Sequence, residues 1–162
     1  MKTAICSGSF DPITLGHVDI IRRAAACFDK VFVCVVPNAE KKHQMFTPEQ
    51  KLLLVRQAVA GLPNVEAELW PGLLVDFARR HGATAVVRGV RNGTDFDTEQ
   101  QMALINRGIC PELETLLLPA APEYQYFSST MAREMIRYDQ PLEKYLPAEI
   151  VAMVRELTRE KQ

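Results

Sequence analysis

The chain has 162 residues, of which 48% are apolar and 24% charged, and its formal net charge is -1. This size and composition predict a single domain, residues 1–162, while the near-neutral charge argues against nonspecific binding to nucleic acid or to a membrane. The four cysteines have no C-x-x-C spacing and the three histidines have no zinc-ligand spacing, so we expect reduced thiols and no structural metal. With no secretory leader and no apolar run of membrane-spanning length, we expect a cytoplasmic protein.

The first predicted elements are a short strand and a helix joined by a turn that contains glycine. Residues Thr3–Ser7 are mostly apolar, and apolar residues recur at helical spacing from Val18 to Phe28. Between them lies the decapeptide GSFDPITLGH, residues 8–17, which places His17 on the first turn of the helix. Free backbone N–H groups and the helix dipole at such a turn attract anions, and glycine lets a ligand approach the backbone closely. The turn is therefore a candidate phosphate site.

The rest of the chain continues to alternate between strand and helix patterns. Thr47, Pro48 and Gln50 supply an N-cap, a proline at the first helical position and a capping-box glutamine, which together mark a helix start. We predict further strands over Val31–Val36, Val65–Trp70, Thr84–Arg88 and Glu114–Leu118. We predict further helices from Thr47 to Gly61, over Leu73–His81, over Phe96–Arg107 with closure at Gly108, over Ser129–Tyr138, and from about Ala148 to about Arg159.

Five strands that alternate with helices predict an α/β fold. We expect a five-stranded parallel sheet with helices on both faces, followed by a C-terminal helix. Right-handed crossovers place all the strand-to-helix loops at one edge of such a sheet, and open α/β sheets bind their ligands at that edge.

Positive charge is predicted to collect at this ligand-binding edge. Five cations lie on the loops or helices that follow strands two, four and five: Lys41, Lys42, Arg88, Arg91 and Arg133. They predict a cationic cleft, beside His17, for a small polyanion. Neither G-x-x-x-x-G-K-[ST] nor G-x-G-x-x-G occurs, which disfavours P-loop kinases and dinucleotide oxidoreductases.

Two segments resemble the signature motifs of the nucleotidyltransferase α/β phosphodiesterase superfamily. One is Thr14-Leu15-Gly16-His17 within the decapeptide, and the other is FSSTMARE at residues 127–134. The middle of the chain is similar to the bacterial phosphopantetheine adenylyltransferase family, through RGVR at 88–91, Asp95-Phe96, Glu99 and ALINR at 103–107. This resemblance covers nearly the whole chain and implies a Rossmann-like nucleotidyltransferase fold.

The resemblance also implies a reaction. Members of the family transfer AMP from ATP to 4'-phosphopantetheine in coenzyme A synthesis, release pyrophosphate and use Mg²⁺. They are typically homohexamers and are feedback-inhibited by coenzyme A. Two alternatives stay open at this point: a nucleotidyltransferase for another phosphate acceptor, such as nicotinamide mononucleotide, and a nucleotide-sensing protein without catalysis.

The resemblance implies roles for individual residues. For phosphopantetheine it implicates Ser9, Lys41, Leu74, Arg88 and Asn106. For ATP it implicates Ser9, Phe10, His17, Gly89, Val90, Arg91, Glu99, Tyr124, Gln125, Tyr126, Phe127, Ser128, Ser129 and Thr130. In direct attack on the α-phosphorus, we expect His17 to donate to the α-phosphate, Lys41 rather than Lys42 to orient the nucleophile, and Arg91 to hold the β,γ-phosphates. We expect Mg²⁺ to be bound mostly through phosphates and water, with no protein ligand cluster.

Overall fold

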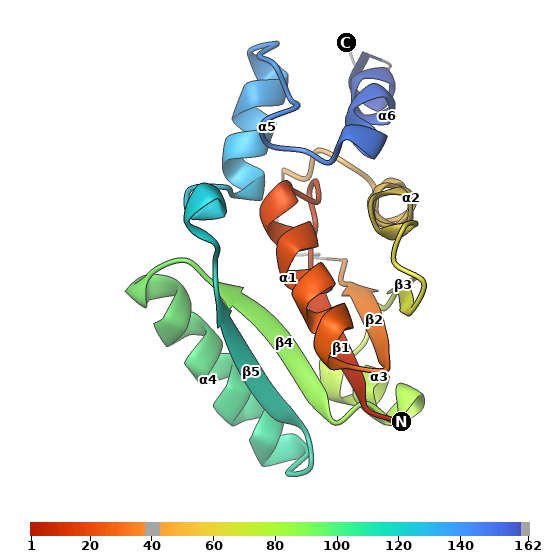
Figure 1. Ribbon diagram of the computed structural model, residues 1–162, viewed down its shortest axis with the longest axis vertical. Coiled ribbons are helices and arrows are strands. Elements are labelled where there is room, and N and C mark those ends of the chain that lie inside the picture. Colours follow the sequence, from red (N-terminus) through yellow and green to blue (C-terminus); the bar gives the residue numbers. More distant parts are fainter. Residues whose placement is uncertain (38–42, 160–162) are drawn as a thin grey trace.

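A five-stranded parallel sheet forms the centre of the molecule (Figure 1). The structure is a computed structural model that describes residues 1–37 and 43–159. The strands are β1 (Thr3–Gly8), β2 (Lys30–Val35), β3 (Val65–Leu69), β4 (Ala85–Val90) and β5 (Glu114–Pro119). They lie in the order β3-β2-β1-β4-β5, so the chain moves to one side of β1 first and then crosses to the other. This confirms the predicted number and parallel arrangement of the strands.

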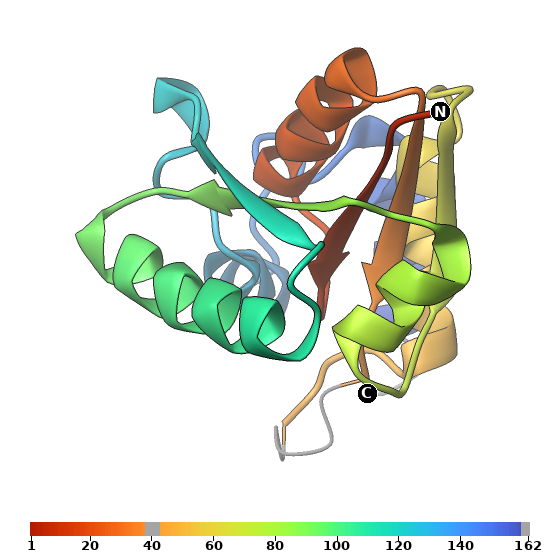
Figure 2. The ribbon, with the colours of Figure 1, turned by 90° about the horizontal axis from the view of Figure 1, so that it is seen from below.

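Helices cover both faces of the sheet. Figure 2 shows α1 on one side, with α3 and α4 on the other. The helices are α1 (Leu15–Cys27), α2 (Pro48–Val59), α3 (Leu74–His81), α4 (Gly93–Ile109), the short 3-10 turn η1 (Pro122–Tyr124), α5 (Ser129–Arg137) and α6 (Ala148–Arg159). The predicted fold class, including the C-terminal helix, is therefore confirmed. None of the helices within the described ranges is both long and apolar enough to cross a membrane.

The core has two parts because the strands point alternate side chains to opposite faces. Ala4 of β1 and Val33 of β2 face a large cluster with residues from α1, α2, α5 and α6. Ile5 and Cys34, one position further along, face a smaller cluster that includes Phe77 of α3. All four of these strand residues are buried, as expected for central parallel strands covered on both faces.

Side-chain caps mark the starts of α1, α2, α4 and α5. The predicted capping box of α2 is present: Gln50 N–H donates to Thr47 Oγ1 at 3.2 Å, and Thr47 N–H donates to Gln50 Oε1 at 3.0 Å. The predicted bounds of α4 were wrong at both ends. Asn92 caps the helix through Oδ1, which accepts the Asp95 N–H at 2.9 Å, and Gly108 lies inside the last turn instead of ending it.

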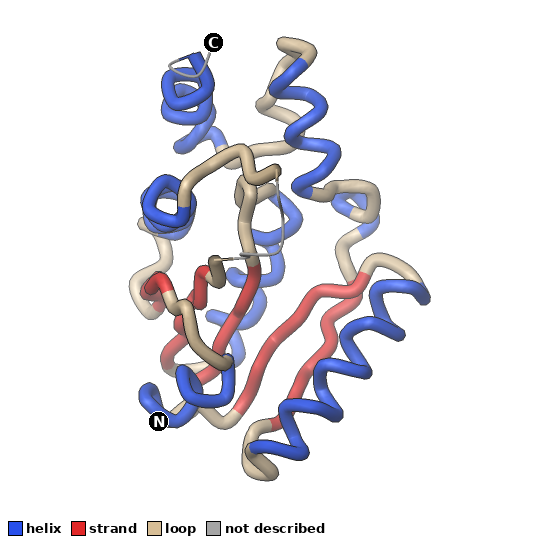
Figure 3. The backbone as a smooth tube through the Cα atoms, turned by 180° about the vertical axis from the view of Figure 1, so that it is seen from behind, coloured by secondary structure: helices blue, strands red, loops and turns tan. Residues whose placement is uncertain are grey.

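The pairing between β1 and β4 is shorter than the other strand pairings. These two strands share only the register pairs Ala4↔Ala85 and Ile5↔Val86, whereas β1 pairs with β2 along all of Thr3–Gly8. The sheet consequently opens towards the carboxyl ends of β1 and β4 (Figure 3). Helix α1 packs close to this opening, and a Cβ on Gly89 would lie 2.8 Å from Ile20 Cγ1, so only glycine fits at position 89.

Candidate active site

A cleft of about 380 Å³ lies where β1 and β4 separate. Its walls come from the carboxyl ends of these strands, the start of α1, one side of α4 and the segment that leads into α5. Twelve of the predicted site residues line it: Ser9, Phe10, His17, Arg88, Gly89, Arg91, Glu99, Tyr124, Phe127, Ser128, Ser129 and Thr130. The fold therefore brings the two motifs, 8–17 and 127–134, together at one cleft.

The remaining predicted site residues do not line the cleft. Val90, Gln125 and Tyr126 are chain neighbours of lining residues, and Tyr126 is 75% exposed. Leu74 packs against the smaller core cluster at the start of α3, and Asn106 lies near the C-terminal end of α4. Lys41 and its alternative Lys42 lie outside the described residues.

Several lining residues were not among the predicted ligand contacts. These are chiefly Cys6, Ser7, Asp95, Ala120 and Arg133. The charge pattern had placed Arg133 at this edge, but without a role. Asp95 lies in the first turn of α4 and reaches back to Arg91, which precedes the Asn92 cap, so helical spacing gave no signal for this pair.

His17 is held in one orientation by the start of α1. Its Nδ1 accepts the N–H of Thr14 at 3.0 Å, and its own backbone N–H donates to Thr14 Oγ1 at 3.3 Å. The ring also packs edge-to-face on Phe10, with a centroid separation of 5.1 Å. Because Nδ1 is an acceptor, the ring proton of the neutral imidazole resides on Nε2.

The charge state of His17 is set by its surroundings. Burial lowers the pKa of His17 to about 4, and the positive charges of Arg88 and Arg91 add to this effect. At neutral pH the residue is therefore an uncharged hydrogen-bond donor through Nε2. A donor of this kind suits an anionic oxygen, because it can polarise the oxygen without first having to lose or gain a proton.

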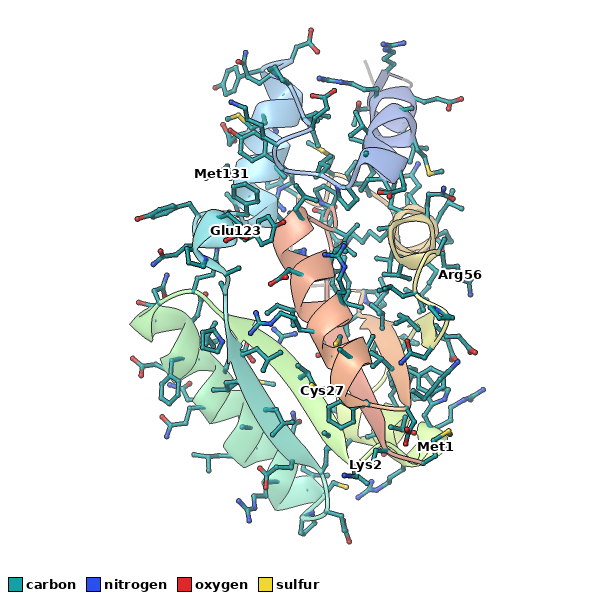
Figure 4. All side chains as sticks on the ribbon, in the orientation of Figure 1. Met1, Lys2, Cys27, Arg56, Glu123 and Met131 are labelled. Atoms are coloured by element: carbon teal, nitrogen blue, oxygen red, sulfur yellow. The ribbon has the colours of Figure 1, made fainter. Side chains whose placement is uncertain are left out.

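The N-terminus of α5 forms a second wall of the cleft, next to the turn that precedes α1. Ser128 caps this helix by accepting the N–H of Met131 through Oγ at 3.1 Å. The first N–H groups of a helix have no acceptor within it, so the start of α5 presents donors and a positive dipole to the cleft. In Figure 4, Met131 and Glu123 lie near the first turn of α1, whereas Cys27 and Lys2 lie near its far end.

A buried carboxylate connects the candidate phosphate-binding turn to two other segments. Asp11 is 4% exposed, and its two carboxylate oxygens accept the N–H groups of Met45 and Phe46, both at 3.0 Å. Arg133 donates to the backbone carbonyl of Asp11 at 2.8 Å and lies 3.6 Å from its carboxylate. Ser129 Oγ donates to the carbonyl of Pro12 at 2.8 Å, which further fixes the turn against α5.

Each arginine that lines the cleft faces a carboxylate. Arg88 binds Glu99 through two hydrogen bonds, Nε–Oε2 at 2.9 Å and Nη2–Oε1 at 2.8 Å. Arg91 donates to Asp95 through Nε at 2.9 Å. Burial acts to raise the pKa of Asp95, but its hydrogen bonds with Arg91 outweigh this and hold the pKa below the usual value. The sequence predicted the cations of the cleft but not their partners.

Cys6 places a neutral thiol on the wall of the cleft. Burial raises the pKa of Cys6 to about 12, against the opposing influence of the Arg88 charge. The thiol therefore stays protonated and contributes apolar surface and not charge.

Comparisons of the sequence with known proteins identify its relatives. Residues 5–135 match the family model described as cytidylyltransferase-like. The phosphopantetheine adenylyltransferase of Shouchella clausii is 40% identical over 159 residues, which are 98% of this chain and 99% of that protein. The protein of the same name from Heliobacterium modesticaldum is 44% identical over 156 residues, 96% of this chain and 92% of that one.

Solved structures agree at the level of the fold. A putative nicotinate-nucleotide adenylyltransferase from Vibrio parahaemolyticus superposes with a TM-score of 0.70 at 21% identity, covering 99% of this chain and 94% of that chain. A bifunctional NMN adenylyltransferase/ADP ribose pyrophosphatase from Francisella tularensis gives a TM-score of 0.71 at 17% identity, covering 98% of this chain and 49% of that chain.

The titration of His17 provides a direct test of the site geometry. An NMR titration should give a midpoint near pH 4 for the His17 ring, because burial and the two arginines oppose its protonation. Below the unfolded-state pKa of about 6.5, only the unfolded chain takes up this proton, so the His17 contribution to folding stability should fall from pH 6.5 towards pH 4. In the variant His17→Asn, this part of the pH dependence of urea unfolding should vanish. A midpoint close to the unfolded-state value would contradict the environment that the structure gives the ring.

Proposed function

The chain belongs to the phosphopantetheine adenylyltransferase family, and we propose that it transfers the adenylyl group of ATP to 4'-phosphopantetheine, giving dephospho-coenzyme A and pyrophosphate. The observation that carries this proposal is the match to relatives of that name at 40% and 44% identity over nearly the whole chain. The cleft supports it, because residues of both nucleotidyltransferase motifs line the same space.

The reaction is an in-line displacement at the α-phosphorus of ATP. An oxygen of the acceptor phosphate forms the new bond to this phosphorus, the bond to the β-phosphate oxygen breaks, and pyrophosphate leaves with that electron pair. The acceptor phosphate is already ionised near neutral pH, so the enzyme needs no strong base and no covalent intermediate. Positioning and stabilisation of charge supply the catalysis.

The described residues have distinct roles in this proposal. His17 donates from Nε2 to an α-phosphate oxygen as negative charge shifts there, and its neutral state near pH 7 preserves this donor. Arg91 and the start of α5 hold the β- and γ-phosphates. Arg88, assisted by Ser9 and Lys41, receives the acceptor phosphate. Leu74 and Asn106 would contact the pantetheine arm beyond the lining of the cleft.

The cleft fits a Mg²⁺ ion that is held by the substrate. Residues 1–37 and 43–159 contain no group of three or more His, Cys, Asp or Glu side chains suited to a metal. The cleft carboxylates Asp95 and Glu99 are engaged by arginines. The ligands of the ion would then be water and the phosphates of ATP, which Arg91 and the start of α5 position. When bound, the ion would neutralise part of the phosphate charge.

We also propose that the enzyme assembles through α4, in the homohexamer that the resemblance implies. Within the protomer, none of the residues of α4 is buried. Leu116 of the neighbouring β5 is 41% exposed. The large apolar side chains of α4 are 45–65% exposed: Phe96, Met102, Leu104, Ile105 and Ile109. So many exposed large apolar side chains on one helix are typical of an interface, and a second copy of the chain is the natural cover for them.

Two further properties complete the proposal. Coenzyme A contains the phosphopantetheine portion of the acceptor, so it would compete at the acceptor site as a feedback inhibitor. All four cysteines are free thiols, which supports a location in the reducing cytoplasm.

A substrate panel tests the proposed reaction. With ATP and Mg²⁺, the chain should release pyrophosphate with 4'-phosphopantetheine and not with nicotinamide mononucleotide, and mass spectrometry should detect dephospho-coenzyme A. Pyrophosphate release with nicotinamide mononucleotide alone would reassign the acceptor. ATP binding without product for any acceptor would indicate a nucleotide sensor.

The variant His17→Asn tests the role of the Nε2 donor. An asparagine keeps an acceptor for the Thr14 N–H but has no group at the position of Nε2, so turnover should fall on the order of 10²-fold, the scale of a lost oxyanion donor. The KM values and the melting temperature should change little, which a steady-state assay and a thermal melt will show. Unchanged turnover would exclude the assigned role.

A charge placed among the exposed apolar side chains of α4 tests the assembly. Leu104→Asp should dissociate the oligomer, because Leu104 is 65% exposed in the protomer and would be buried in the assembly. The matched control is Leu53→Asp, since Leu53 is 50% exposed but lies on α2. Sedimentation velocity should show smaller particles for Leu104→Asp only. A monomeric wild-type protein, or the same effect from both variants, would refute assembly through α4.

A further inference from the structure

The three carboxylates that face the cleft arginines are anchored differently. Asp11 also accepts main-chain N–H groups from Met45 and Phe46, and Asp95 also accepts the main-chain N–H of Arg91 at 3.0 Å. Within residues 1–37 and 43–159, Glu99 forms hydrogen bonds to the side chain of Arg88 alone. Glu99 can therefore leave its partner without breaking a backbone hydrogen bond.

The hydrogen bonds of Arg88 show which part of it a ligand must use. Its Nη1 bonds to the carbonyl and the hydroxyl of Ser7 in β1, across the opening between β1 and β4. Its Nε and Nη2 form the planar edge that matches a carboxylate or a phosphate, and both are occupied by Glu99. A phosphate that binds Arg88 in this bidentate manner must take the place of the Glu99 carboxylate.

The position of this pair makes the exchange energetically significant. The side chains of Arg88 and Glu99 are only 31% and 13% exposed, so water and salt screen their attraction less than they screen a surface pair. A carboxylate ligand would replace the Glu99 carboxylate by another singly charged, bidentate partner of Arg88. Its binding would therefore gain little free energy. A phosphate dianion brings a second negative charge and a third acceptor oxygen, so it has the stronger attraction to the guanidinium.

We propose that Glu99 is a specificity-determining residue that competes internally for Arg88, so that the cleft accepts phosphate dianions and rejects carboxylates. The proposal rests on the proposed function only in taking the acceptor to be a phosphate ester. Arg88 stays aligned through Ser7 while Glu99 is displaced, and α4 keeps its start through the Asn92 cap.

Titration with inorganic phosphate and with acetate tests this proposal, at about pH 8, where phosphate is mostly the dianion. In Glu99→Gln, phosphate should bind about tenfold more tightly, the scale of one charge-assisted hydrogen bond. Acetate, which the wild-type cleft rejects, should become a detectable ligand. Calorimetry measures both affinities, and the NMR signal of the Arg88 Nε–H reports binding at this side chain.

Two control variants identify the cause of the gain. Asp97→Asn removes the same charge from an exposed position on α4, and it should leave both affinities unchanged. Adding Arg88→Gln to Glu99→Gln should abolish the gain. The proposal is refuted if Glu99→Gln binds phosphate no more tightly than the wild type, or if Asp97→Asn reproduces the gain.

A crystal structure of the wild-type chain with phosphate provides a test that does not depend on the folding of a variant. It should show phosphate on Nε and Nη2 of Arg88, with the Glu99 carboxylate beyond about 4 Å, the limit of an ion pair. Phosphate bound elsewhere with the Arg88–Glu99 pair intact would overturn the proposal. Phosphate and acetate are not substrates, so their binding can be measured apart from the reaction. If phosphate but not acetate displaces Glu99 from Arg88, yet phosphopantetheine is not turned over, only the proposed acceptor is refuted. Turnover without exchange would refute only the role of Glu99.

Discussion

The early separation of β1 from β4 is the constraint on which the site depends. Two register pairs join these central strands. Beyond Ile5 and Val86, the facing edges of β1 and β4 are not paired with each other. Backbone polar groups exposed in this way require other partners. The carbonyl of Ser7 finds one in the guanidinium of Arg88, so the same side chain closes the open sheet and contributes charge to the cleft. The switch in strand order thereby produces both the space and the chemistry of the site.

The cleft balances its charges before any ligand arrives. Arg88, Arg91 and Arg133 each lie within ion-pair distance of a carboxylate, so the described part of the cleft is close to electrically neutral. This arrangement holds the guanidinium groups in fixed orientations, which reduces the entropy that a ligand must remove on binding. His17 follows the same pattern, because its Nδ1 is held by Thr14 and only Nε2 remains to interact with a ligand.

The sequence predicted the parts of the molecule that depend on local patterns. The five strands, the capping box at Thr47 and the segments that meet in the cleft all follow from short-range periodicity or from motifs. The start of α4 was missed because Asn92 caps the helix in a segment without apolar periodicity. The Arg88–Glu99 and Asp11–Arg133 pairs were missed because the partners lie 11 and 122 residues apart, and only the tertiary fold determines such contacts.

The network around Asp11 has a consequence for protein synthesis. Asp11 lies at the start of the chain, yet its contacts come from Phe46 and from Arg133, 35 and 122 residues further along. A chain that grows from its N-terminus cannot complete the contacts of this turn until α5 has left the ribosome. Incomplete chains, including those truncated before α5, therefore contain the first motif but lack the contacts of Ser129 and Arg133 that hold its turn in place.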